Sequence, residues 1–182
     1  MKKLGFTLIE LIVSVGIITM VTGIFLANYS SANRRSDLSM TSQKLVSDIR
    51  MAQNYALGLA RYGLSGSLNV PAGGWGIHID LQNYGNNKYI LFADDNGDKI
   101  FQADEADIRY GAQITNLPTN IIISSMSSGS RADITFLPPD PITTIIGSVS
   151  DFEQVDIVLK DEKTNSIKTV RVNYLGLAEV ID

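Results

Sequence analysis

The sequence contains no cysteine among its 182 residues. It therefore cannot form a disulfide, a thiolate zinc site or a cysteine nucleophile, although this does not exclude an oxidising compartment. His78 is the single histidine, so a histidine-rich metal site is excluded as well. The sequence also lacks a G-x-S-x-G nucleophile turn and a phosphate-binding glycine loop. These absences predict that the chain is not an enzyme and has no catalytic residues.

Basic charge is in deficit, with 15 Lys and Arg against 19 Asp and Glu and a formal net charge of −4. This charge disfavours a surface that binds polyanions. Four basic residues fall near one predicted hairpin, but acidic residues alternate with them; they are Lys160, Lys163, Lys168 and Arg171. Nucleic acid is therefore not an expected partner.

Proline is absent from the first 70 residues, and an apolar run occupies residues 6–27. A helix of about 22 residues is about 33 Å long, enough to cross the hydrocarbon core of a bilayer. The run contains one charged residue, Glu10. A carboxylate deep in lipid costs up to about 2.5–3.5 kcal/mol. Because the run holds no cation, we expect the partner of Glu10 to lie on another molecule.

The motif KKLGFTLIEL at residues 2–11, followed directly by the apolar run, resembles the class III signal of type IV pilins and type II secretion pseudopilins. The resemblance implies that residues 1–5 are a leader and that a membrane peptidase cleaves between Gly5 and Phe6. It also implies N-methylation of Phe6 and an assembly contact of Glu10 with a neighbouring subunit. The alternative is an ordinary signal anchor. A cleaved secretory signal is disfavoured because no small-x-small site follows the run.

The same resemblance implies the partners and the location of the chain. Other pilin or pseudopilin subunits, prepilin peptidase, an assembly ATPase and a polytopic platform protein would be its partners. The chain would wait in the inner (cytoplasmic) membrane as a single-pass protein with its head outside the cytoplasm. It would then join an extracellular or periplasmic filament.

Beyond the apolar run, small and apolar residues recur at intervals of three and four, which predicts an amphipathic helix. This stripe consists of Leu38, Thr41, Leu45, Ile49, Ala52, Ala56 and Leu59. We therefore predict one helix over residues 6–60, whose first half (6–29) spans the membrane and whose second half (30–61) packs on a head. A coiled-coil dimer is the alternative. Gly16 and Gly23 predict either a packing seam or a flexible point.

Glycines and alternating apolar residues replace the helical pattern from Tyr62 onwards, so residues 62–182 are predicted to form a β-rich head. Strands are expected at residues 75–79, 88–93, 120–124, 133–136, 153–160, 167–173 and 177–181. The prolines at 138, 139 and 141 require a loop or a sheet edge. The predicted fold class is α+β, a long N-terminal helix packed on an antiparallel sheet. The order of these segments resembles H-type minor pseudopilins and related minor pilins.

Two polar features of the head have simple interpretations. His78 alternates with Trp75, Ile77 and Ile79, so we expect it on the opposite face of its strand and on the surface. The serine-rich segment 124–130 is expected to be a surface loop.

A third polar feature nearly matches the twelve-residue calcium loop. Its candidate ligands are Asp94, Asn96, Asp98 and Glu105. The sixth position, where the loop needs glycine for a sharp turn, is Lys99. The favoured interpretation is a solvated hairpin turn without a cofactor, and a calcium site is the alternative.

Together these patterns predict a minor pilin or pseudopilin that is processed and then assembles through its N-terminal helix. The alternative function is a monomeric membrane-anchored module that binds calcium, DNA or a surface ligand.

Overall fold

The computed structural model describes residues 7–63, 68–103, 112–138, 142–148 and 151–181, and for residues 27–35 it describes the backbone alone. These residues form two compact units, which divide between Ser36 and Asp37. Helix α1 (Leu8–Leu57) contributes to both units.

The first unit is the apolar part of α1. Its segment Leu8–Leu26 has a mean hydropathy of 2.3 and is long and apolar enough to cross a membrane. Three hydroxyls in it, those of Ser14, Thr19 and Thr22, donate to the carbonyl oxygen four residues earlier, each at 2.7 Å. These polar side chains are therefore satisfied within the helix, as an apolar environment requires.

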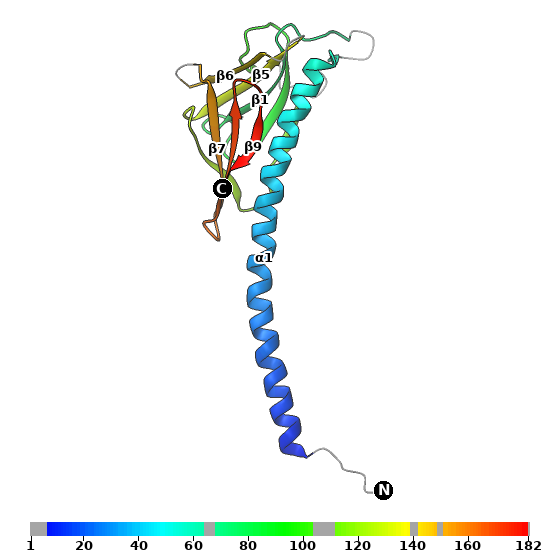
Figure 1. The fold of residues 1–182 in the computed structure, drawn as a ribbon, viewed down its shortest axis with the longest axis vertical. Helices are drawn as coiled ribbons and strands as arrows, with labels where there is room; N and C mark the ends of the chain where they lie inside the picture. Colours follow the sequence, from blue (N-terminus) through cyan, green and yellow to red (C-terminus); the bar gives the residue numbers. More distant parts are fainter. Residues whose placement is uncertain (1–6, 64–67, 104–111, 139–141, 149–150, 182) are drawn as a thin grey trace. The chain divides into compact units, whose positions relative to one another are not determined.

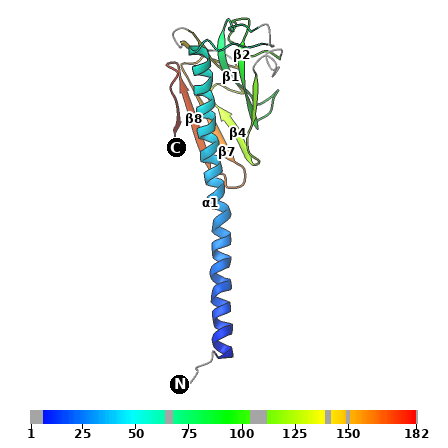
Figure 2. The same cartoon turned by 90° about the vertical axis from the view of Figure 1, so that its right-hand side faces the viewer.

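The second unit is the head, in which every paired strand is antiparallel (Figures 1 and 2). One sheet has the order β3-β2-β1-β5-β6 and the other has the order β4-β7-β8-β9. The strands are β1 (Gly74–Asp80), β2 (Lys88–Asp94), β3 (Gln113–Asn116), β4 (Ile121–Met126), β5 (Arg131–Leu137), β6 (Ile142–Gly147), β7 (Gln154–Asp161), β8 (Ile167–Asn173) and β9 (Ala178–Ile181). The α+β class with a long N-terminal helix packed on antiparallel sheets is confirmed.

The second half of α1 packs on both sheets through the predicted stripe. Its buried members are Leu38, Thr41, Leu45, Ile49, Ala52 and Ala56, and the apolar ones among them share a core with strands of both sheets. The prediction was wrong for Leu59, which is exposed. The helix ends at Leu57, and Leu59 has a positive φ of 50°, so its side chain leaves the helical stripe.

A buried carboxylate fixes α1 against β2. Asp48 is buried and accepts a hydrogen bond of 2.7 Å from the hydroxyl of Tyr89. Lys44 Nζ lies 2.5 Å from the same carboxylate. Burial, with the Asp48 carboxylate beside it, raises the pKa of Tyr89 far above its usual value. The tyrosine therefore stays protonated and keeps donating.

Seven strands fall where they were predicted, and β3 and β6 were not predicted. β6 follows the prolines and forms a sheet edge, as those prolines require. The surface-loop prediction for residues 124–130 was wrong in part, because β4 extends to Met126 and both Met126 and Ser128 are buried. The hydroxyl of Ser128 donates to the carbonyl oxygen of Arg131, which satisfies it inside the fold.

Candidate functional site

The amino-terminal end of α1 places Glu10 beside Thr7. The Thr7 hydroxyl donates to Glu10 Oε2 at 3.3 Å and accepts from the Glu10 backbone N–H at 3.3 Å. These contacts resemble a capping box, in which a T-x-x-E sequence satisfies the first turn of a helix. Glu10 therefore has a partner within its own chain, which the sequence analysis missed although the T-x-x-E signal was present. The Thr7 hydroxyl is uncharged, so this hydrogen bond does not compensate the negative charge of the Glu10 carboxylate.

The apolar side chains behind Glu10 are not covered by any of the residues that the structure describes in the first unit. Every large hydrophobic residue from Leu8 to Leu26 is more than half exposed. A continuous apolar surface of this length requires lipid or other helices around it. Gly16 and Gly23 have open space where a Cβ would lie, so neighbouring helices can approach closely there.

Residues 1–26 match the family model of the prokaryotic N-terminal methylation motif. This motif marks the leader that precedes the first helix of type IV pilins and pseudopilins. The chain carries a prepilin leader. The match supports a type IV pilin-like subunit that prepilin peptidase processes, and it implies assembly with other pilin subunits.

The predicted cleavage and methylation residues of the prepilin leader, Gly5 and Phe6, lie outside the described residues. No curated protein and no solved structure matches the chain. The similarity to H-type minor pseudopilins therefore stays a prediction.

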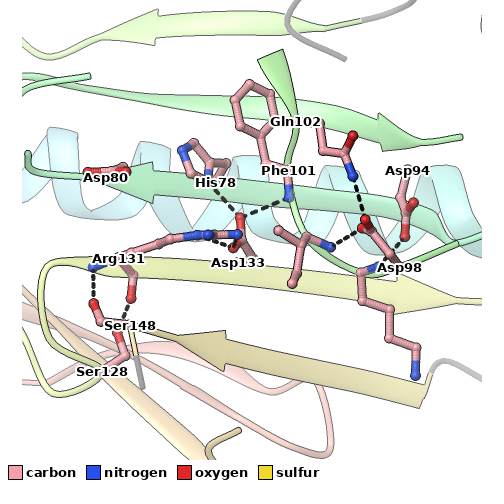
Figure 3. Close-up of polar contacts among 12 residues, drawn as sticks. His78, Asp80, Asp94, Asp98, Phe101, Gln102, Ser128, Arg131, Asp133 and Ser148 are labelled. Atoms are coloured by element: carbon pink, nitrogen blue, oxygen red, sulfur yellow. Dashed lines mark hydrogen bonds and ion pairs between the residues drawn. The ribbon is translucent and has the colours of Figure 1, made fainter. Parts of the chain in front are cut away.

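The acidic turn after β2 uses its oxygens to hold its own backbone (Figure 3). Asp94 is fully buried and accepts from the N–H groups of Gly97 and Lys99, both at 2.8 Å. Asn96 Oδ1 accepts from the backbone N–H of Asp98, and Asp98 Oδ1 accepts from the backbone N–H of Ile100, each at 2.8 Å. The described oxygens among the proposed calcium ligands, those of Asp94, Asn96 and Asp98, thus already have partners.

Lys99 adopts a left-handed backbone with φ of 66°. This is the conformation for which the calcium loop uses glycine, and a residue with a Cβ adopts it at a cost. Burial raises the pKa of Asp94 above its usual value, and the N–H donors of Gly97 and Lys99 only partly offset that effect. The fourth proposed ligand, Glu105, lies outside the described residues. Within the part of the chain that is described, no three acidic, histidine or cysteine side chains are grouped to hold a metal ion.

We expect calcium to leave the thermal stability of the chain unchanged. A ligand present at 100 times its Kd stabilises by about 2.7 kcal/mol, which would shift the melting temperature by several degrees. Thermal unfolding of the full chain in detergent, with millimolar calcium and with a chelator, measures this shift. A rise of several degrees that Asp94→Ala abolishes would contradict the expectation and establish a calcium site.

His78 is buried, so the prediction of a surface residue was wrong. It does lie on the opposite face of β1 from Trp75, Ile77 and Ile79, which join the main core. That opposite face is covered by a second cluster formed by Ile90, Phe92, Phe101 and Ala112 with Tyr84. The His78 ring stacks on Phe101 with the ring centroids 4.2 Å apart. Sequence alternation places a residue on a face, but loops distant in sequence decide whether that face is covered.

Asp133 on β5 organises the polar side of this cluster (Figure 3). Its Oδ1 lies 2.6 Å from His78 Nδ1 and accepts from the backbone N–H of Phe101 at 3.3 Å. Its Oδ2 accepts from Arg131 Nε at 2.6 Å. The two serines in the same view, Ser128 and Ser148, bond to the backbone of Arg131. The described contacts of the His78–Asp133 pair are therefore those of a structural anchor that holds the end of the acidic turn.

One basic residue of the β7–β8 hairpin, Arg171, is paired with an acidic residue. Arg171 Nε lies 2.8 Å from Asp156 Oδ1 across the two strands. The hydrogen bond from Arg171 lowers the pKa of the Asp156 carboxyl below its usual value. This pairing consumes part of the positive charge that a nucleic acid would need.

Proposed function

We propose that the chain is a minor pilin or pseudopilin subunit that assembles through its N-terminal helix into a type IV pilus or a type II secretion pseudopilus. The observation that carries the proposal is the prepilin leader at residues 1–26, followed by the uncovered apolar helix surface from Leu8 to Leu26. The subunit waits in the cytoplasmic membrane with its head outside the cytoplasm. A platform protein and an ATPase then move it into the filament, where the helices cover one another. The role is structural and not catalytic.

The driving contact of assembly is a charge pair. Among the residues that the structure describes, the Glu10 carboxylate has one hydrogen-bond donor, the uncharged Thr7 hydroxyl at 3.3 Å. Cleavage before Phe6 creates a positive amino terminus on each subunit. When Glu10 of one subunit reaches the amino terminus of a neighbour, two unpaired charges become one pair in a medium of low dielectric constant. The site residues are thus Gly5 and Phe6 for processing and Glu10 for assembly.

The mature protein should begin at Phe6 and carry one N-methyl group. Intact-mass analysis of protein purified from sheared filaments of the native host measures both changes at once. A Gly5→Val variant, which places a branched side chain at the scissile bond, should keep the mass of the full chain. Recovery of filament-incorporated protein that retains residues 1–5 would disprove the proposed function.

A further inference from the structure

The acidic turn after β2 contains Asn96–Gly97, the only Asn–Gly pair in the sequence. Glycine has no side chain to hinder its backbone nitrogen, so the Gly97 nitrogen can attack Cγ of Asn96 and form a five-membered imide. The bond from Cγ to Nδ2 then breaks, and Nδ2 leaves as ammonia with the proton of the Gly97 N–H. Water opens the imide at either carbonyl and leaves aspartate or isoaspartate. By sequence, Asn96 is therefore the asparagine of this chain best suited to spontaneous deamidation.

Solvent reaches this pair, because Asn96 and Gly97 are both exposed. The water that the reaction consumes is therefore at hand, and exposure alone would predict a fast reaction. Burial does not protect the pair. Any protection has to come from hydrogen bonds that hold the reacting atoms in place.

Carboxylates of the same turn hold both reacting groups, and Asp94 and Asp98 are drawn in Figure 3. The Gly97 N–H donates to Asp94 Oδ1 at 2.8 Å. Asn96 Nδ2 donates to Asp98 Oδ2 at 3.1 Å, and Asn96 Oδ1 accepts from the Asp98 backbone N–H at 2.8 Å. The reaction requires the Gly97 N–H to lose its proton and Cγ of Asn96 to become tetrahedral. Both changes break these hydrogen bonds, so the closed turn opposes the reaction.

The turn is also fixed at both of its ends. At the start, Asp94 is fully buried at the end of β2, and its carboxylate leaves no room for a Cβ at Gly73. The Gly73 N–H donates to the Asp94 carbonyl oxygen at 2.9 Å. After the turn, the Phe101 N–H donates to Asp133 Oδ1 at 3.3 Å. A segment held in this way opens rarely, and the reaction has to wait for that opening.

We propose that Asn96 is a deamidation site that the acidic turn keeps closed, so that the reaction proceeds only in chains whose turn has opened. Deamidation adds a carboxylate beside those of Asp94, Asp95 and Asp98, and isoaspartate also adds a methylene to the main chain. The added charge is repelled by its neighbours, and the added methylene shifts the N–H groups away from their acceptors. The modification thus marks an opened turn and prevents it from closing again. This proposal is independent of the role in filaments.

The rate of deamidation of the full chain in detergent tests the proposal. The rate is measured in the folded state and in guanidinium chloride, at the same neutral pH and temperature. Trypsin cleavage after Lys88 and Lys99 releases a peptide whose single asparagine is Asn96, and mass spectrometry of this peptide measures the conversion. We expect the folded chain to react at least about tenfold more slowly, since opening must first break charge-assisted hydrogen bonds. Equal rates in the two states would overturn the proposal.

Two variants locate the protection within the turn. Asp94→Ala removes the acceptor of the Gly97 N–H and should raise the rate in the folded state about tenfold. Asp95→Ala is the matched control, because it removes a neighbouring carboxylate that instead accepts from the hydroxyl of Tyr62. It should leave the rate close to that of the unsubstituted chain. Equal rates in the two folded variants would overturn the proposal. If Asp94→Ala unfolds the chain, the comparison of the folded and unfolded states still decides.

Discussion

Replacing Glu10 by valine should leave the chain cleaved and in the membrane but lower its share in filaments by at least tenfold. The variant removes one member of the proposed charge pair and leaves the amino terminus of a neighbour buried without a counter-charge. Breaking a buried pair in this way costs about 3–5 kcal/mol, which exceeds the tenfold equivalent of about 1.4 kcal/mol. The measurement is the ratio of chain in sheared filaments to chain in membranes, in an otherwise unaltered host.

Glu10→Gln separates the charge from the helix cap. Glutamine can still accept the hydrogen bond that Thr7 donates to Glu10 in the structure, but it has no charge. If the charge pair drives assembly, Gln fails as Val does. If capping of the first turn is what matters, Gln restores incorporation, and the charge mechanism is wrong. The mechanism also fails if Glu10→Val chains are found along the filament shaft in unchanged amounts.

A chain that begins at Asp37 should fold as a soluble monomer, whereas a chain that begins at Tyr62 should not fold. The longer chain contains the second half of α1, which the shorter chain lacks. Leu45, Ile49 and Ala52 of this half lie in the core and have no exposed surface. Each large apolar side chain contributes about 1.5–3 kcal/mol when fully buried. Loss of the whole stripe therefore costs on the order of 10 kcal/mol, comparable to the total stability of a domain.

Thermal unfolding followed by circular dichroism compares the two truncated chains. Two point variants provide a finer comparison in the chain from Asp37. Ile49→Ala should cost about 2–5 kcal/mol because it leaves a cavity, and Leu57→Ala should cost less than about 0.5 kcal/mol because Leu57 is exposed. Equal melting temperatures for the two truncated chains would show that the helix does not stabilise the head.

The parts of this fold that the sequence predicts are those with a strong period. The stripe from Leu38 to Ala56 has the 3.6-residue period of a helix, and the strands around Trp75 and Ile134 alternate or are apolar throughout. β3 was missed because most of its residues, Gln113–Asn116, are exposed and show no alternation. β6 was missed because it is an edge strand that follows three prolines, where sequence signals favour a loop.

The candidate site was predictable where its chemistry is local. The leader motif lies within ten consecutive residues, and the family match confirmed it. The burial of His78 was not predictable, because Tyr84 and Phe101 reach it from separate loops. The left-handed backbone of Lys99 was not predictable either. Neighbouring hydrogen bonds to Asp94, rather than the preference of lysine, impose that conformation.

The strand order also constrains when the head can fold during synthesis. β1 lies between β2 and β5 in its sheet, yet β5 is made only after β3 and β4, and β4 must wait for β7 in the other sheet. Such pairings between distant segments form slowly, because a long loop must close before any contact compensates the lost entropy. The apolar stripe of α1 is synthesised first and stays uncovered until the last strands appear. The nascent chain therefore passes through a stage in which this apolar stripe is exposed and prone to aggregation.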